Sequence, residues 1–441
     1  MASAAPRRIA FVCMTPASDA NEHAVEMPSY GVRRVLAAVA ADPEQQGTKF
    51  ALIDMRRPEV EAYVAGILSF EPDLIGISIY VWSMPCLVEV ARRVKRLRPG
   101  CIIVFGGPSA RTAAFELPLF LNAHTYADAV VATEGETVFR DIARLPQLTR
   151  AALETIPGLD LPVAGGWRKT APRPAIARLD DIPSPYQLGL MGKGDVAYLE
   201  TFRGCPFSCA FCEWGASDAA KTVFSTAYIE RELQAFARHG VPAIFLVDAG
   251  LNLNNHAFRN LKEAADRTGL LRRMEFWSEI YPSHVREEHL EFLSSVQASY
   301  LGIGLQSIDP EVLKGLDRPF DVRRFENVVR QVCGLARAEL QIIYGLPGDS
   351  PEGFRRTLAY ARSLPASVRA YHCLVLPDAL MTRSKPEWEV CYDPVTLRMT
   401  SCKGWSAEQL RETNAWITNE ARAAGGKAGD FWWHFPASSR A

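Results

Sequence analysis

Three cysteines, Cys205, Cys209 and Cys212, form the most chemically specific pattern in this 441-residue sequence. Three residues separate the first pair and two separate the second, so one short loop holds all three. Such a loop can direct three thiolates at one centre. On a four-iron cluster, three thiolates leave one iron without a protein ligand, and that iron can bind the amine and carboxylate of a substrate. The alternatives are a zinc site or three buried thiols, although zinc usually takes four ligands and no second pair lies nearby.

The other seven cysteines are less informative. The chain has ten cysteines and no secretory context, which favours metal or redox chemistry in a reducing, cytoplasmic compartment over a disulfide framework. Cys13 and Cys101 lie in apolar runs, and we expect them to be small core residues. One of Cys373, Cys391 and Cys402 is a candidate for a reactive thiol.

The composition excludes several classes of protein. Apolar residues make up 48% of the chain, and 49 basic residues nearly balance 50 acidic ones. This balance argues against a basic nucleic-acid-binding protein and against an acidic tail. No apolar run reaches the roughly 18 residues that a membrane span needs, so we expect no membrane partner. At about 100–200 residues per domain, the length suggests two or three domains.

Residues 1–150 predict an α/β domain with a parallel sheet. The expected strands are Arg8–Cys13, Lys49–Met55, Leu74–Ile79, Cys101–Phe105 and Ala129–Ala132, and the helices include Tyr30–Ala41, Val60–Leu68 and Leu87–Leu97. Continuous apolar strands that alternate with helices are typical of a doubly wound, Rossmann-like sheet. Ligands bind such sheets beyond the carboxyl ends of the strands. Residues 151–192, rich in proline and glycine, are predicted to be a linker.

Residues 193–380 predict a second parallel sheet. The expected strands are Ala197–Phe202, Ala243–Asp248, Met274–Glu279, Tyr300–Gln306, Leu340–Tyr344 and Ala370–Leu376, with helices between them. Six β–α units indicate a partial (β/α)6 barrel of the TIM type, with its chemistry at the carboxyl ends of the strands. Residues 381–441 are expected to form a short C-terminal cap, whose aromatic run Phe431–Phe435 covers the barrel mouth or docks the tail.

The cysteine loop follows the first barrel strand and has an aromatic residue, Phe211, before its last cysteine. In this setting it resembles the radical S-adenosylmethionine (SAM) superfamily. The resemblance implies a 4Fe-4S cluster on the three cysteines, whose free iron binds SAM and whose electron cleaves SAM to a 5′-deoxyadenosyl radical. It also implies contacts to SAM from residues near later strand ends, namely Asp248, Asn252, Glu279, Gln306, Ser307, Arg318 and Gly345. Alternatively, the glycine-rich strand ends reflect close packing alone.

The first domain resembles the cobalamin-binding domains that are fused to many radical SAM enzymes. Three turns carry the resemblance, with the residues Ser78, Tyr80, Trp82, Ser83, Gly106, Gly107, Pro108, Glu134, Gly135 and Glu136. Glycines allow close approach of a large ligand, and aromatic side chains can cover a corrin face. The Asp-x-His-x-x-Gly loop that ligates cobalt in other cobalamin proteins is missing, since neither His23 nor His124 has that context. The alternatives are a fold that has lost its ligand and a flavodoxin-like sheet for another cofactor.

Together the resemblances imply an enzyme, a cobalamin-dependent radical SAM C-methyltransferase acting on an unactivated carbon of a small molecule or natural-product intermediate. In the family's usual scheme, one SAM methylates cobalamin, and a second gives the radical that prepares the substrate to take methyl from methylcobalamin. A reductant such as flavodoxin or ferredoxin is an expected partner, and nucleic acid is not. Tyr371 and His372 are candidate proton handlers, although a lone histidine is more often structural. The alternatives are cyclisation, ring rearrangement or oxidation with the same cofactors, and a non-catalytic cobalamin- or redox-sensing protein.

Overall fold

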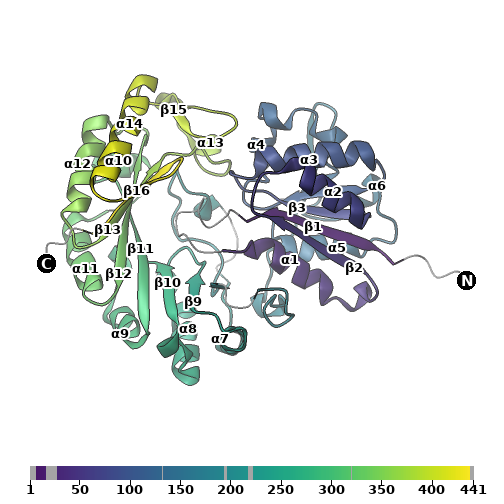
Figure 1. Cartoon of the computed structure of the whole chain (residues 1–441), viewed down its shortest axis with the longest axis horizontal. Helices are drawn as coiled ribbons and strands as arrows, with labels where there is room; N and C mark the ends of the chain where they lie inside the picture. The colour runs from purple at the N-terminus through teal and green to yellow at the C-terminus, as the bar shows by residue number, and fades with distance from the viewer. Residues whose placement is uncertain are drawn as a thin grey trace, which may run out of the picture. The chain divides into compact units, whose positions relative to one another are not determined.

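The computed structural model describes residues 6–15, 27–131, 133–192, 196–216, 222–318 and 320–437. It contains two compact α/β units (Figure 1). The first comprises the chain up to Gly192 together with the short segment Pro394–Thr396, and the second comprises the rest. None of the described helices combines the length and the apolar character that crossing a bilayer requires.

The first unit is built on a seven-stranded sheet in the order β2-β1-β3-β4-β5-β6-β7. Its first five strands are parallel, as predicted: β1 Arg8–Met14, β2 Lys49–Met55, β3 Leu74–Ser78, β4 Ile102–Gly106 and β5 Ala129–Val131. The helices are α1 Tyr30–Ala40, α2 Val60–Phe70, α3 Met84–Leu97, α4 Thr112–Phe115, α5 Gly135–Ala143 and α6 Arg150–Leu153. The strand order reverses between β1 and β3, which is where such sheets bind their ligands.

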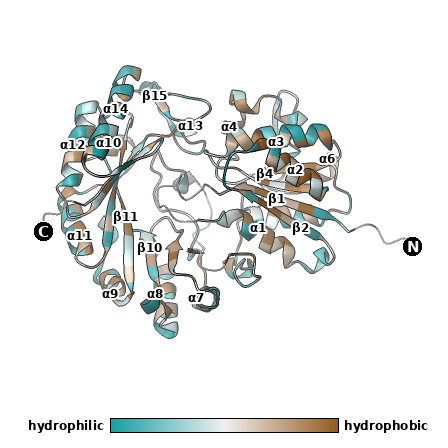
Figure 2. Cartoon of the chain, in the orientation of Figure 1, coloured by the Kyte–Doolittle hydropathy of each residue, from teal (hydrophilic) through white to brown (hydrophobic). Residues whose placement is uncertain are grey.

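Continuous apolar sequence explains why these strands lie at the centre of the first unit. The side chains of β1 are almost wholly buried from Ile9 to Met14, and β3 is buried from Leu74 to Ile77. Figure 2 shows the hydrophobic colour along β1. Strands that are apolar on both faces need cover on both faces, and the helices between the parallel strands provide it.

Residues 151–192 are more ordered than the predicted linker. They contribute β6, Leu159–Val163, and β7, Gly166–Lys169, which extend the first sheet in antiparallel fashion. The turn between these strands contains Gly165, at φ 85°, a left-handed conformation that glycine adopts without strain. The glycines that suggested a linker therefore mark a tight hairpin turn.

The second unit is built on an eight-stranded sheet in the order β16-β17-β13-β12-β11-β10-β9-β8. Six strands are parallel, as predicted: β8 Ala197–Leu199, β9 Ala243–Leu246, β10 Glu275–Glu279, β11 Ala298–Gln306, β12 Arg337–Tyr344 and β13 Ser367–His372. The helices between them are α7 Thr226–His239, α8 Asn255–Thr268, α9 Glu287–Ser295, α10 Pro310–Gly315, α11 Val322–Cys333 and α12 Pro351–Arg362. The carboxyl ends of all six strands therefore lie at one edge of the sheet.

The C-terminal segment is partly an extension of this sheet, where the sequence predicted a separate cap. Strand β17, Trp432–Phe435, pairs antiparallel with β13, and β16, Lys427–Ala428, pairs with β17. The aromatic run thus covers the edge of β13, whose backbone groups would otherwise be unpaired. The rest of the segment contains α13 Leu380–Arg383, β14 Cys391–Tyr392, β15 Met399–Ser401 and α14 Ala407–Ala423.

Candidate functional site

The cysteine loop follows β8 at the carboxyl edge of the second sheet. Cys209 is buried, whereas Cys205 and Cys212 are half-buried. The loop turns tightly, because the Cys212 amide donates to the Cys209 carbonyl at 3.0 Å and the Ala210 amide donates to the Leu316 carbonyl at 3.0 Å. Burial, and then the proximity of the Cys209 and Cys205 thiols, raises the pKa of Cys212 to about 11. The three sulfur atoms are thus near enough to interact electrostatically.

The loop supplies three thiols, the number of protein ligands that leaves one iron of a four-iron cluster open. Within the described residues, no three His, Cys, Asp or Glu side chains are arranged to hold one ion. Ligands of one zinc ion must converge within about 2.3 Å of it. In a four-iron cluster each thiolate binds a different iron, so the three sulfur atoms need only surround a larger body.

Arg318 brings a cation to this loop. Its Nη1 lies 3.9 Å from Cys209 Sγ, and its Nη2 donates to the Gly304 carbonyl at 2.5 Å. The guanidinium also lies 5.0 Å from the centre of the Tyr281 ring, and Tyr281 stacks on Phe207 of the loop at 4.6 Å. The predicted candidate Arg318 is therefore placed beside the cysteines.

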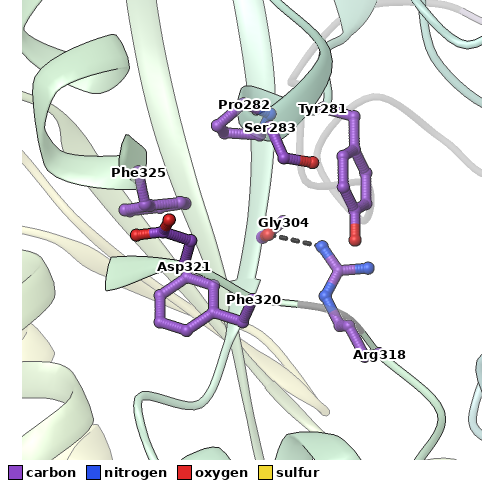
Figure 3. A pocket seen from close by; sticks show the side chains of 8 residues that line it. All are labelled: Tyr281, Pro282, Ser283, Gly304, Arg318, Phe320, Asp321 and Phe325. Carbon is purple, nitrogen blue, oxygen red and sulfur yellow. Dashed lines mark hydrogen bonds between the residues drawn. The ribbon is translucent and has the colours of Figure 1, made fainter. Parts of the chain in front are cut away.

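Arg318 and Tyr281 line one side of a small pocket that is open to solvent. Figure 3 shows Phe320, Asp321 and Phe325 on the opposite side, with Gly304 between the two groups. The dashed line marks the hydrogen bond from Arg318 to Gly304. The pocket thus lies near the carboxyl end of β11, and two of its lining residues, Arg318 and Tyr281, contact the cysteine loop.

Asp248 supports the start of the cysteine loop from within the protein. It is buried, and its carboxylate accepts hydrogen bonds from the Thr201 amide at 2.8 Å, from the Thr201 hydroxyl and from the Phe202 amide at 3.4 Å. Burial raises the pKa of Asp248 to about 7, although the Thr201 hydrogen bonds oppose the shift. Asp248 thus positions the backbone at the start of the loop, and its contact with SAM stays a prediction.

Asn252 is likewise engaged with the backbone. Its Nδ2 donates to the Tyr281 carbonyl at 2.8 Å, and its Oδ1 accepts from the Tyr281 amide at 2.9 Å. Both ends of the amide group are used, so Asn252 fixes the Tyr281 backbone. It acts on the site through the Tyr281 ring.

Glu279 lies at the end of β10, on the half-buried face of that strand. Gln341 of β12 donates to its Oε1 at 2.9 Å, although β11 separates the two strands. The bond is formed across Gly302 of β11, where an added Cβ would overlap the Glu279 carboxylate. The half-buried carboxylate is thus held where it can accept hydroxyl hydrogen bonds from a ligand.

At the end of β11, the missing side chain of Gly304 leaves space for the side chains of Gln306 and Arg318. A Cβ at Gly304 would lie 2.6 Å from Gln306 Nε2 and 2.9 Å from Arg318 Nη2. Gln306 adopts φ 67°, a left-handed conformation that is uncommon outside glycine. Its buried Oε1 has no hydrogen-bond partner among the described residues. Strain and an unpartnered polar atom are typical of functional positions.

Ser307 and Gly345 belong to the packing beneath these residues. The Ser307 hydroxyl is fully buried, lies 3.5 Å from Asp349 Oδ2 and accepts from the Asp309 amide at 3.2 Å. Burial raises the pKa of Asp349 to about 6. Gly345 has φ 82°, and an added Cβ there would lie 3.2 Å from Leu410 and 3.5 Å from Cys373. Both predicted residues are placed near the site, in supporting positions.

Tyr371 and His372 point to opposite faces of β13. Tyr371 is half-buried and pairs with Ile343, so it shares the face of Gln341 and Glu279. His372 is buried on the other face, stacks on Tyr344 at 4.6 Å, and its Nε2 lies 2.9 Å from the Met399 carbonyl. Burial lowers the pKa of His372 to about 4. This environment favours the structural alternative for His372.

In the first unit, the turn after β3 presents two stacked aromatic rings. Tyr80 and Trp82 stack at 4.5 Å with an angle of 17°, and Trp82 is 46% exposed. The buried Ser83 hydroxyl accepts from the Tyr80 amide at 2.9 Å, which fixes the turn. Ser78, the last residue of β3, is half-buried beside it. The turn therefore offers an ordered aromatic surface at the carboxyl edge of the sheet.

The turn after β4 lies against this one. Gly107 has φ 95°, and a Cβ there would lie 2.6 Å from the Ile79 carbonyl oxygen, so both conformation and space require glycine. A Cβ at Gly106 would meet nothing within 4 Å, and Pro108 is exposed. Gly107 therefore joins the two turns, while Gly106 faces open space.

The turn after β5 is engaged within the unit. Glu134 Oε2 accepts from the Ile176 amide at 2.7 Å. Glu136 is buried, and its carboxylate lies 3.8 Å from Arg34 of α1. A Cβ at Gly135 would lie 3.1 Å from Val35. These contacts explain Glu134, Gly135 and Glu136 as residues that pack α5, so the predicted cofactor contacts remain a proposal for this turn.

His124 lies in a short helical turn, Ala123–Thr125, that precedes β5. It is therefore at the amino edge of the sheet, opposite the ligand edge. His23 follows β1 in the sequence and lies outside the described residues.

Several residues of this site were not predicted from the sequence. Gln341 lies inside β12 and Tyr281 follows β10, and neither stands in a pattern that sets it apart. Asp349 follows the glycine-rich end of β12, and this sequence pattern could have indicated that it lies near the site. Arg383 is 171 residues from its partner Cys212, and only the fold brings them together.

Comparison with known families separates the two units in the same way. Residues 20–143 match the model of the B12 binding domain, and residues 199–361 match that of the radical SAM superfamily. The chain therefore carries a B12 binding domain and a radical SAM domain. The second match spans the cysteine loop, the strands that end at Glu279 and Gln306, and Arg318, which follows α10.

The relatives that this chain matches include named methyltransferases. It is 30% identical over 348 residues to 2-(S-pantetheinyl)-carbapenam-3-carboxylate methyltransferase of Streptantibioticus cattleyicolor. The aligned region covers 73% of this chain and 49% of that relative. The chain is 27% identical over 367 residues to the cobalamin-dependent radical SAM methyltransferase TokK of Streptomyces tokunonensis, covering 76% and 52%. The chain thus spans about half the length of the curated relatives it matches.

A solved structure of similar fold is the radical SAM methyltransferase TsrM from Kitasatospora setae. The TM-score is 0.68 at 17% identity, covering 93% of this chain and 87% of TsrM. This likeness confirms the predicted fold of both units.

Proposed function

We propose that this protein is a cobalamin-dependent radical SAM methyltransferase that methylates an unactivated carbon of a small molecule. The proposal is carried by the three-cysteine loop, with Arg318 3.9 Å from Cys209 Sγ, in a chain that also has a B12-binding domain. When bound, the cluster supplies the electron that cleaves SAM, and cobalamin carries the methyl group.

The three cysteines are proposed to bind the cluster, and Arg318 the carboxylate of SAM. A guanidinium binds a carboxylate with two parallel hydrogen bonds. Arg318 is already oriented by the Gly304 carbonyl and the Tyr281 ring, so it needs little reordering to accept a ligand. Asp248 and Asn252 hold the surrounding backbone.

Glu279 and Gln306 are proposed to bind the remainder of SAM. The Glu279 carboxylate suits the two ribose hydroxyls, each of which can donate a hydrogen bond. The buried Gln306 Oε1 needs a donor, which a ligand would provide. Gly302 and Gly304 leave the space that these side chains occupy, and Ser307 and Gly345 support them. Tyr371, on the same face, is proposed to contact the substrate.

In the first unit, we propose that the Tyr80–Ser83 turn and the open position at Gly106 receive cobalamin. The exposed Trp82 ring provides apolar area for a large planar ligand. We also propose that no strong protein ligand binds cobalt. An electron paramagnetic resonance spectrum of the Co(II) form is expected to lack splitting from a protein nitrogen, and such splitting would contradict this point.

The substrate class rests on the relatives. One of them acts, by its name, on a carbapenam carboxylate, which is a small molecule. A reductant such as flavodoxin or ferredoxin and a reducing, cytoplasmic compartment remain predictions, because an exposed cluster needs low-potential electrons and little oxygen.

The test is anaerobic reconstitution with iron, sulfide and cobalamin, followed by reaction with SAM that carries a deuterated methyl group. Candidate small molecules are assayed by mass spectrometry. We expect transfer of the labelled methyl group to carbon, together with S-adenosylhomocysteine and 5′-deoxyadenosine. Formation of 5′-deoxyadenosine with no S-adenosylhomocysteine would contradict methyl transfer and favour another radical reaction.

A further inference from the structure

Arg383 connects the C-terminal segment to the backbone of the cysteine loop. It is the last residue of α13, and its guanidinium donates to two carbonyl groups of the loop, that of Ser208 at 3.1 Å and that of Cys212. A third hydrogen bond, to the Asp378 carbonyl at 2.7 Å, ties the guanidinium to its own segment. One side chain therefore bridges two points of the loop that lie on either side of Cys209.

The segment around Arg383 is anchored by buried residues and makes further hydrogen bonds at and next to the cysteine loop. Ala379 and Leu380 are fully buried, and the Arg383 amide donates to the Ala379 carbonyl at 2.8 Å. The Asp378 amide also donates to Glu213 Oε1 at 3.3 Å, just beyond the last cysteine. Lys385 Nζ donates to the Gly315 carbonyl at 3.2 Å, next to Leu316, which accepts from Ala210 of the loop.

These contacts form a latch, which we define as residues 378–385. The loop itself has no regular strand or helix between Arg203 and Phe211. Strand or helix hydrogen bonds therefore do not hold its carbonyl groups in place, and a planar guanidinium can bind two of them at once. The Ser208 carbonyl directly precedes Cys209, and the second carbonyl belongs to Cys212 itself. Holding both carbonyls therefore fixes the backbone that orients these two thiols.

We propose that Arg383 is a positioning residue, whose guanidinium holds the cysteine loop in the conformation that receives the iron–sulfur cluster. The inference rests on the proposed function in so far as it assigns the cluster to these cysteines. Arg383 contacts the loop backbone and is not itself proposed to touch SAM or substrate. Arg318 contacts the Cys209 thiol, whereas Arg383 binds the backbone carbonyl groups of the loop.

The geometry distinguishes arginine from lysine at this position. A lysine retains the positive charge but has one nitrogen, which cannot span the Ser208 and Cys212 carbonyls as the guanidinium fork does. If Arg383 acted only through its charge, lysine would replace it fully. If it acts by bridging, lysine would restore part of the effect.

The first measurement is hydrogen–deuterium exchange on the full chain without iron, for Arg383→Gln, Arg383→Lys and the control Arg330→Gln. Arg330 is exposed on α11 and pairs with Glu326, away from the loop. We expect Arg383→Gln to speed exchange of the loop amides by about tenfold, because hydrogen bonds to a charged donor are lost, with α7 and α14 unchanged. Arg383→Lys should be intermediate, and Arg330→Gln should match the parent.

The second measurement is the iron and sulfide content of the same proteins after anaerobic reconstitution. We expect Arg383→Gln to bind less than half the iron of the parent, with Arg383→Lys between them. Parent-like exchange of the loop in Arg383→Gln would overturn the proposal, as would full restoration by lysine. Neither measurement uses methyl transfer. Failure of the proposed function would leave the exchange result standing, and failure of the latch would leave methyl transfer open.

Discussion

Gln341 donates a hydrogen bond of 2.9 Å to the Glu279 carboxylate across an intervening strand, and Gly302 of that strand leaves the space for it. The two residues belong to β12 and β10, and only a position without a side chain on β11 lets them meet. The glycine in Gly302-Ile303-Gly304 is thus explained by a specific contact. This contact fixes the carboxylate that we propose for the SAM ribose.

Gly302→Ala is therefore expected to displace Glu279 and weaken SAM binding. Loss of a hydrogen bond to a charged group corresponds to about tenfold in affinity. Equilibrium dialysis of SAM with the reconstituted protein measures this effect. The matched control is Gly100→Ala, where an added Cβ meets nothing within 4 Å. Unchanged affinity in Gly302→Ala would separate Glu279 from SAM binding.

The neighbouring glycines of the first unit should respond differently to the same substitution. Gly107→Ala is expected to destabilise the unit by about 1–3 kcal/mol, because it strains a left-handed residue against the Ile79 backbone. Gly106→Ala should fold normally, since its Cβ faces open space, yet bind cobalamin more weakly if the corrin approaches there. Thermal unfolding and absorbance titration with cobalamin test both. Normal cobalamin binding by Gly106→Ala would place the ligand elsewhere.

Asp248 gives a pH dependence with a definite sign. Its pKa in the folded chain, about 7, lies above its ordinary value of 3.8. A raised pKa means that its favourable contribution is complete below about pH 4 and is lost as pH rises to about 7. Asp248→Asn should remove that decline, as measured by hydrogen-exchange protection factors for β8 and β9.

Two further groups affect the same pH range, so the comparison must be between variants. Asp349, with a pKa raised to about 6, acts in the same direction as Asp248. His372, with a pKa lowered to about 4, acts in the opposite direction. The control is Asp266→Asn on the surface of α8. An identical pH profile in Asp248→Asn and the parent would contradict the assignment.

Substitutions of Tyr371 and His372 are expected to have different effects, one on turnover and the other on the free energy of unfolding. His372→Phe is expected to lower stability by about 1–3 kcal/mol through the lost hydrogen bond to Met399, with little effect on the pH profile of turnover. Tyr371→Phe should keep the fold and change turnover, because Tyr371 shares the face of Glu279. Urea unfolding and product formation at several pH values provide the measurements. A changed pH profile in His372→Phe, with unchanged stability, would restore the proton-handling role.

The sequence predicted those parts of the molecule that depend on local pattern. Apolar runs located the parallel strands, and the cysteine spacing located the loop. The hairpin of β6 and β7 was not predicted, because Gly165 signals a turn without saying whether strands flank it. For Phe431–Phe435 the sequence left two alternatives, and the pairing of β17 with β13 agrees with docking of the tail; an aromatic run alone does not reveal which edge it covers.

The site was harder to predict wherever a side chain acts through a distant partner. Asp248 and Asn252 follow β9 as expected, yet their hydrogen bonds go to Thr201 and Tyr281 rather than to open space. No local pattern indicates which polar groups the fold will satisfy internally. Arg383 could not be predicted for the same reason. Its partners Ser208 and Cys212 are distant in the sequence, and only the fold brings the C-terminal segment to the loop.

The measurement that tests the account most directly is the quantity of each SAM product formed by the reconstituted full chain. The parent and Cys333→Ala, a cysteine on α11 outside the loop, are compared with Cys209→Ala. We predict S-adenosylhomocysteine and 5′-deoxyadenosine together from the parent and Cys333→Ala, and no 5′-deoxyadenosine from Cys209→Ala. Continued formation of 5′-deoxyadenosine by Cys209→Ala, or its absence from the parent, would contradict the central claim.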